Sequence, residues 1–146
     1  MMRPVLIAMS VVALAGCGAG GTPAEQQVAA VNGASVLKVK DTIAVCGDSH
    51  EALATAGKAL SDLRDAVITG PDAMGPLADA RLVLSHSASV SVAAVAKPML
   101  VLADDMGRVR VAISGVDGAA LTAGIKSMSD DLVVLVGACK AVGGWT

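Results

Sequence analysis

Residues 117–144 read DGAALTAGIKSMSDDLVVLVGACKAVGG, and this stretch decides the expected fold. Apolar side chains recur in it at spacings of three and four residues, which places them on one face of an α-helix. Asp117 is a typical N-cap residue, and Gly143-Gly144 is a typical helix stop. Residues 133–136 alone would suit a strand, but the longer helical pattern outweighs them. The apolar positions are Leu121, Ile125, Met128, Leu132, Leu135, Cys139 and Val142.

An earlier helix of the same domain is expected to begin at Asp48. Asp48 can cap it, and Glu51, three residues later, completes a capping box. Apolar residues then follow at three- and four-residue spacings from Leu53 to Val67, and Gly70-Pro71 ends the helix. Residues 25–45 mix helical with strand-like spacing, and we interpret them as helical.

The region from Leu82 to Ile113 allows two interpretations. Serines alternate with apolar residues over 85–92, and residues 104–107 suit a hairpin turn, which together would give an α+β fold with strands in this region. Helices are favoured, because Ala-rich flanks raise helix propensity and the apolar residues from 99 to 116 keep an unbroken helical spacing. Pro98 is expected to separate two helices and to stand in the first turn of the second, where its missing N–H is harmless.

The first 17 residues have the pattern of an export signal. Arg3 supplies a positive start, Val5 to Ala13 form an apolar run, and Leu14-Ala15-Gly16-Cys17 places small residues before a thiol. This stretch resembles a bacterial lipoprotein signal peptide with its lipobox. The resemblance implies that Cys17 receives diacylglycerol, that the chain is cut before it, and that the protein is anchored by lipid on the extracytoplasmic face of the cell membrane. An uncleaved anchor fits less well, because the apolar run is shorter than the roughly 20 residues of a spanning helix.

Three segments follow from this interpretation. Residues 1–16 are the signal peptide, residues 17–33 are the lipidated N-terminus with a flexible Gly-rich tether, and residues 34–146 are a single helical domain. About 130 residues remain after cleavage, which is enough for one core. That core must consist of Ala, Val, Leu, Ile and Met, since the chain has no Phe or Tyr and a single Trp. Trp145 is expected to be an exposed tail or a small plug on the end of the domain.

Cys46 and Cys139 distinguish between three and four helices. In an exported chain the two cysteines left beside Cys17 are expected to form a disulfide; two buried free thiols are the alternative. Three long helices would separate these cysteines by roughly 30 Å at 1.5 Å per residue, which is beyond disulfide reach. Breaks at Gly70-Pro71, near Pro98 and at 115–117 give four helices and bring both cysteines to one end. We therefore expect an all-α, up-down four-helix bundle closed by a Cys46–Cys139 disulfide.

Residues 43–50, IAVCGDSH, resemble the first block of the SGNH/GDSL hydrolases, in which the serine of Gly-Asp-Ser is the nucleophile. The resemblance implies Ser49 as a nucleophile. Those enzymes also need an Asn-bearing oxyanion block and an Asp-x-x-His base block. Asn32 is the only Asn and precedes the motif, and neither His50 nor His86 has an Asp three positions before it. A helix cap explains the same residues, and we expect no catalytic residue and no enzyme activity.

Binding of nucleic acid, metal or a cofactor is not expected. The net charge is -2, and Lys and Arg are not clustered as nucleic-acid binding requires. His50 and His86 stand in no metal-ligand spacing, and no Asp-rich calcium loop occurs in the sequence. Asp104-Asp105 and Asp130-Asp131 are interpreted as acidic pairs that keep a helix face hydrated; a role in binding a cation is a weak alternative.

The expected function is that of a lipid-anchored cell-envelope lipoprotein with a non-enzymatic helical domain that serves as a binding or structural module. The Ala-rich, aromatic-poor composition is similar to that of small uncharacterised helical envelope lipoproteins of high-GC bacteria. The expected partners are the membrane, through the lipid on Cys17, and an envelope protein or lipid. The alternative is a lipid-binding or lipid-shuttling protein with methionines along an acyl-chain cavity, although methionine also fills cores. The methionines concerned are Met74, Met99, Met106 and Met128.

Overall fold

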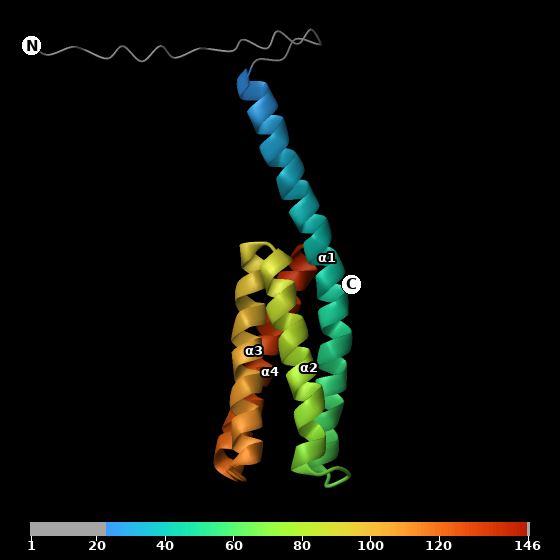
Figure 1. Ribbon diagram of the computed structural model, residues 1–146, viewed down its shortest axis with the longest axis vertical. Coiled ribbons are helices and arrows are strands. Elements are labelled where there is room, and N and C mark those ends of the chain that lie inside the picture. Colours follow the sequence, from blue (N-terminus) through green and yellow to red (C-terminus); the bar gives the residue numbers. More distant parts are fainter. Residues whose placement is uncertain (1–22, 146) are drawn as a thin grey trace, which may run out of the picture.

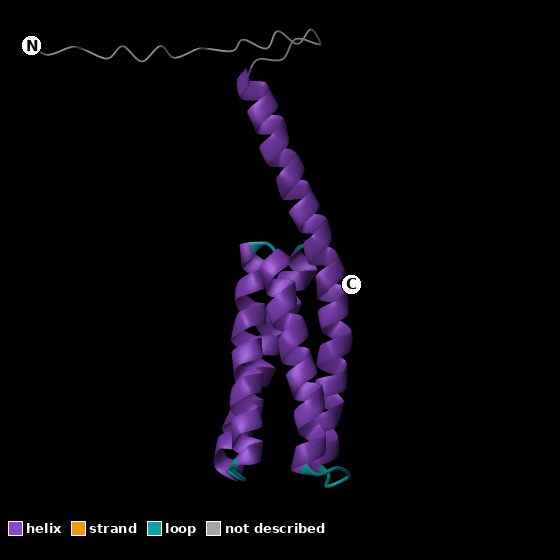
Figure 2. Cartoon of the chain, viewed as in Figure 1, coloured by secondary structure: helices purple, strands orange, loops and turns teal. Residues whose placement is uncertain are grey.

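Four α-helices make up the part of the chain that the computed structural model describes, residues 23–145. They are α1 (Pro23–Arg64), α2 (Gly70–Val90), α3 (Ala93–Ser114) and α4 (Gly118–Ala141). Short turns join them, so that successive helices run up and down beside one another (Figure 1). The predicted all-α four-helix bundle is confirmed. No strand occurs between residues 23 and 145, so the alternative α+β fold with strands from Leu82 to Ile113 is wrong (Figure 2).

α1 joins two predicted segments, the helical stretch at residues 25–45 and the helix expected to begin at Asp48. The sequence interpretation placed a helix start at Asp48, but α1 continues through this residue without a break. Thr42, Cys46 and Ser49 are fully buried and lie at helical spacing, so the packed face of α1 starts before the cap signal. The helix continues through Asp48 because the turns on both sides of it already pack on the bundle.

The first half of α1 extends beyond the other three helices as an arm (Figure 1). Residues 35–41 of this arm are exposed. α1 begins at Pro23, so residues 23–33, which the sequence interpretation assigned to the tether, belong to this helix. Residues 1–22, with the predicted signal peptide and lipidated cysteine, lie outside the described residues.

The turn between α1 and α2 also begins earlier than predicted. α1 ends at Arg64, and Gly70-Pro71 opens α2 instead of ending the preceding helix. Proline is harmless there, because the N–H groups of the first helical turn have no partner within the helix. The Asp72 carboxylate accepts hydrogen bonds from the backbone N–H (2.9 Å) and the hydroxyl (2.6 Å) of Thr69, the N-cap residue. These bonds hold the pKa of Asp72 below its usual range and stabilise the start of α2.

The turn between α2 and α3 lies at Ser91 and Val92, upstream of the predicted break at Pro98. Pro98 lies inside α3, in its second turn, where it removes one helical hydrogen bond. Val95 and Met99, on either side of it, are fully buried. Their packing keeps this turn helical despite the proline.

Thr42 of α1 supplies a hydrogen bond that the start of α3 needs. Its Oγ1 accepts a hydrogen bond from the Val92 N–H (2.9 Å) and donates one to the Lys38 carbonyl (2.7 Å). Val92 is the N-cap residue of α3, and its own side chain has no atom that can cap a helix. A buried threonine of one helix therefore helps to set the residue at which another helix begins.

We expect Thr42→Val to lower the free energy of unfolding by about 1–2 kcal/mol, because it leaves the Val92 N–H without its acceptor. Thr55→Val is the matched control, since Thr55 is exposed and its hydroxyl donates to the Glu51 carbonyl of its own helix. The control should stay within about 0.5 kcal/mol of the wild type. Urea denaturation followed by circular dichroism measures both variants. Equal losses in the two would contradict the capping role.

α2 and α3 form the centre of the bundle, with α1 packed on α2 and α4 packed on α3. α3 contributes eight buried residues, whereas α4 contributes two, Leu135 and Cys139. The other apolar positions predicted on α4 are only half-buried. α4 therefore turns only part of its apolar face toward the core. The largest fully buried side chains are Leu77, Leu84, Met99, Leu102, Met106 and Leu135.

Both ends of α4 are as predicted. The Asp117 carboxylate accepts a hydrogen bond from the Ala120 N–H (2.9 Å) at the start of the helix. Gly143 follows the helix with a φ of 81°, a conformation that favours glycine. Gly144 is required for a different reason, since a Cβ atom on it would come within 2.7 Å of the Cys46 Cβ.

A disulfide joins Cys46 of α1 to Cys139 of α4, with an S–S distance of 2.10 Å and a Cα–Cα distance of 6.0 Å. The predicted bridge is thus confirmed. Trp145 lies at the same end of the bundle, where its Nε1–H donates a hydrogen bond to the Cys46 carbonyl (2.6 Å). Its ring stands edge-on to the ring of His50, with centroids 5.4 Å apart. The interpretation of Trp145 as a small plug is confirmed.

Candidate ligand-binding groove between α1 and α4

The edge between α1 and α4 is the open side of the bundle. These two helices make few contacts with each other, whereas each successive pair of helices packs closely. The disulfide ties them together at one end. Two hollows that share Leu132 lie along this edge, and we call them together the α1–α4 groove; a third hollow lies at the far end of the bundle.

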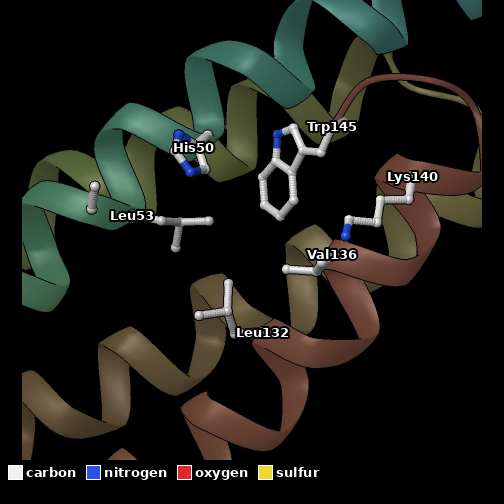
Figure 3. A pocket seen from close by; sticks show the side chains of 7 residues that line it. His50, Leu53, Leu132, Val136, Lys140 and Trp145 are labelled. Atoms are coloured by element: carbon white, nitrogen blue, oxygen red, sulfur yellow. The ribbon is translucent and has the colours of Figure 1, made fainter.

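The first hollow lies at the disulfide end and has a volume of about 340 Å³. Leu53 of α1 faces Leu132 and Val136 of α4 across it, and the ring of Trp145 closes one end (Figure 3). Its walls are therefore mainly apolar. The lining residues are His50, Leu53, Ala54, Leu132, Val136, Lys140 and Trp145.

The second hollow, of about 260 Å³, continues the first, because Leu132 lines both. The third, of about 340 Å³, lies at the opposite end, near the turns that join α1 to α2 and α3 to α4. From Ile125 to Val136 the first and second hollows follow α4 for about 16 Å at 1.5 Å per residue. The second hollow is lined by Gly57, Leu60, Ser61, Arg64, Ile125, Met128, Ser129 and Leu132. The third is lined by Leu63, Gly70, Pro71, Ala112, Ile113, Val116, Asp117, Gly118 and Leu121.

The groove uses residues that the sequence pattern assigned to the core. Ile125, Met128 and Leu132 belong to the predicted apolar face of α4, and they are half-buried along the groove. Leu135 and Cys139, on the same helix, are fully buried toward the core. Periodicity identifies the apolar face of a helix but not the neighbour that covers it, so no sequence signal distinguished these two sets.

The two ends of the groove differ in charge. Lys140 stands at the rim of the first hollow, and no salt bridge to it occurs within residues 23–145. Arg64 lines the second hollow, but its Nε and Nη2 donate to the Asp65 carboxylate at 2.8 and 3.2 Å. Those hydrogen bonds hold the pKa of Asp65 below its usual range, so the carboxylate stays charged and compensates the guanidinium. The uncompensated positive charge therefore lies at the Trp145 end.

Ser49 does not lie in the groove. Its side chain is fully buried, and its Oγ donates to the Ser87 Oγ of α2 (3.4 Å). His50, the next residue, projects toward Trp145 instead. Within the described residues no histidine is hydrogen-bonded to Ser49, so the structure does not assemble the Ser-His pair that the hydrolase-like motif would require.

The methionines fall into separate environments. Met99 and Met106 are fully buried in the core, as adaptable packing residues. Met74 of α2 lies beside the hydroxyl of Ser114, the last residue of α3. Met128 lines the second hollow of the groove. Of the four methionines considered for an acyl-chain cavity, Met128 is therefore the one that the structure brings to the α1–α4 groove.

The two histidines occupy unrelated places. His50 lines the first hollow, while His86 is exposed on α2. In the part of the chain that the structure describes, no three His, Cys, Asp or Glu side chains gather in a way that would hold a metal ion.

Asp105 differs from the prediction that both acidic pairs lie on hydrated surfaces. Its side chain is buried between α3 and α4, where it accepts hydrogen bonds from Ser127 Oγ (3.1 Å) and Arg108 Nη1 (3.2 Å). Arg108 also pairs with Asp104, which is exposed as predicted. The pattern of apolar spacing could not identify this burial, because it depends on the donors that α4 brings to the carboxylate.

Asp131 of α4 shares this environment. A hydrogen bond with Asp105 is the main cause that raises the pKa of the Asp131 carboxyl, and partial burial and the charge of Asp105 add to it. Asp130 acts in the same direction through its charge, while Arg108 opposes it. The folded protein therefore holds a proton on Asp131 more tightly than the unfolded chain does.

We expect Asp131→Asn to flatten the pH dependence of stability. Because the pKa of Asp131 is higher in the folded protein, its protonation stabilises the fold below the pKa of the unfolded chain, about 3.9. This stabilisation is lost as the pH rises through the pKa of Asp131 in the folded protein. The variant should therefore be more stable than the wild type at pH 7, with the difference shrinking toward pH 3.5. Urea midpoints at both pH values measure this effect, with the exposed Asp79→Asn as the control. A constant difference across this pH range would refute the raised pKa of Asp131 in the folded protein.

None of the helices between residues 23 and 145 combines the length and the apolarity needed to cross a bilayer. Comparisons of this chain with family models, with curated proteins and with solved structures give no match.

Proposed function

We propose that this protein is a lipid-anchored cell-envelope lipoprotein whose helical domain binds another envelope component in the α1–α4 groove. The observation that carries the proposal is the half-buried apolar face of α4, from Ile125 to Val136, on an edge that α1 leaves open. Apolar walls with a few polar groups at the ends are typical of small-molecule and peptide sites.

The anchoring part of the proposal depends on the lipobox at Leu14-Ala15-Gly16-Cys17. A lipid on Cys17 would place the α1 arm between the membrane and the bundle, because the arm leads toward that end of the chain (Figure 1). Metabolic labelling with an alkyne analogue of palmitate tests this part. The wild type should be labelled in the membrane fraction and Cys17→Ser should not. Labelling of both proteins would contradict the assignment of Cys17.

Gly57→Leu tests the groove. Gly57 lines the second hollow, and a Cβ atom built on it meets no other atom within 4 Å, so a larger side chain has room to enter the hollow. Gly137→Leu is the matched control, because Gly137 is also a helical glycine with free space but is exposed on α4 and does not line the groove. Both variants should fold.

The experiment is native mass spectrometry of the chain from residue 18 onward, incubated with an extract of the bacterial envelope. We expect a defined bound component on the wild type and on Gly137→Leu, and much less of it on Gly57→Leu. A domain that takes up nothing would contradict the proposal. Equal binding to all three proteins would contradict it as well, because the component would then lie elsewhere.

A lipid-binding or lipid-shuttling role is the second candidate. The long, mainly apolar lining of the groove favours it over a role that uses polar surface contacts. In the mass spectrum, a component of lipid mass would support this second role, whereas a polypeptide would favour a protein partner.

A further inference from the structure

The α1–α4 groove is long for its volume. Its two hollows, of about 340 and 260 Å³, together lie in the size range of small-molecule sites. They follow α4 for about three turns, from Ile125 to Val136. The groove therefore suits a slim, extended small molecule.

An acyl chain has a suitable length for this space. One leaflet of a bilayer is about 15 Å thick, half of the hydrocarbon core, and a single acyl chain spans it. The continuous groove formed by the first and second hollows extends for about 16 Å between Ile125 and Val136. It therefore has room for one such chain and for a polar head group at its end.

The charges orient this occupant. Lys140 stands at the Trp145 end without a salt bridge among the described residues, and Figure 3 shows its side chain extending over the first hollow toward Val136. At the other end of the second hollow, Asp65 already compensates Arg64. The Trp145 Nε1–H is occupied by the Cys46 carbonyl, so the indole presents apolar surface to the hollow. The positive charge at one end of the groove therefore suits an anionic group, and the apolar walls along the groove suit a hydrocarbon chain.

We propose that the α1–α4 groove binds a single-chain anionic amphiphile, a long-chain fatty acid, with its chain along α4 and its carboxylate beside Lys140. This inference deepens the function proposed above and depends on the groove being a binding site. The carboxylate accepts a charge-assisted hydrogen bond from the Lys140 ammonium, with His50 on the opposite rim. The hydrocarbon covers the half-buried side chains of Leu132, Met128 and Ile125, which gains free energy by removing apolar surface from water.

The test uses Trp145, the only tryptophan, as a fluorescent reporter at the head-group end. Palmitate and the zwitterionic lysophosphatidylcholine with the same acyl chain are titrated below their critical micelle concentrations, at pH 7.5. We expect palmitate to change the Trp145 emission and to bind more tightly than the zwitterionic probe. Native mass spectrometry should show one palmitate per chain.

Two lysine variants isolate the head-group contact. Lys140→Met keeps the length of the side chain and removes its charge, and it should weaken palmitate binding about five- to ten-fold, the range of one charge-assisted hydrogen bond. It should leave the affinity for the zwitterionic probe unchanged. Lys126→Met is the control, because Lys126 lies on α4 outside the groove and pairs with Asp130. The control should bind both probes as the wild type does.

The outcomes separate this inference from the function on which it depends. If Lys140→Met binds palmitate like the wild type, or if the wild type binds both probes equally, the assignment of an anionic head group is overturned. In either case, the groove is still supported as the binding site if Gly57→Leu weakens binding. If the component retained from the envelope is a polypeptide that Gly57→Leu releases, the fatty acid is overturned and the groove stands. If Gly57→Leu changes neither experiment, both proposals fail.

Discussion

Replacing Cys46 and Cys139 together by alanine is expected to lower the free energy of unfolding by about 4 kcal/mol. The bridge joins residues 93 positions apart, so reducing it restores the entropy of a long loop to the unfolded chain. It is also the covalent tie across an edge where α1 and α4 otherwise make few contacts. For a domain of this size the loss corresponds to a fall in Tm of about 15 °C.

Thermal denaturation with and without a reducing agent measures this effect. The reduced wild type should resemble the double variant, and the reducing agent should not change the variant further. Trp145 lies against the Cys46 carbonyl and should report the loosening of this end of the bundle by its fluorescence. A loss below about 1 kcal/mol would show that noncovalent contacts suffice to hold the α1–α4 edge.

Leu135→Ala is expected to cost about 3 kcal/mol, within the range for fully buried leucines. Leu135 is the one large aliphatic side chain of α4 that is fully buried, and the cavity left by its removal would lie where α4 meets the rest of the core. Val134→Ala is the matched control on the same turn. Val134 is 57% exposed, so its truncation should change stability by less than about 0.5 kcal/mol.

Urea denaturation gives both values for these α4 variants. Equal costs for Leu135→Ala and Val134→Ala would mean that α4 is held by its ends alone and not by its packed face. Leu135 and Cys139 lie one helical turn apart on the same face, so Leu135→Ala and the cysteine substitutions are expected to be non-additive when combined.

The helical content and the number of helices could be predicted from the sequence. The apolar spacing of residues 117–142 is long enough to outweigh the strand-like run at 133–136. Cys46 and Cys139 constrained the number of turns, because only an even number of antiparallel helices brings them to one end. These predictions depended on patterns that extend over many residues, and such patterns are robust to local exceptions.

Single-residue signals were less reliable for the helix boundaries. Asp48 suggested a cap and Pro98 suggested a break, but both lie inside helices. Each favours a local conformation by a few kcal/mol at most, and the packing of buried neighbours exceeds that preference. The break before α3 is aided instead by Thr42, which is 50 residues away from its partner Val92 in the chain. No local pattern reveals such a hydrogen bond.

The sequence by itself determined the helices, their apolar faces and the disulfide, since these depend on periodicity and on the reach of a covalent bond. Only the tertiary structure decided that α1 leaves the α4 face half covered, that Asp105 is buried, and that the hydroxyl of Ser49 donates to Ser87. Those features depend on how closely two helices distant in sequence approach each other. That approach is set by the packing of α2 and α3 between them, which the pattern of a single helix does not contain.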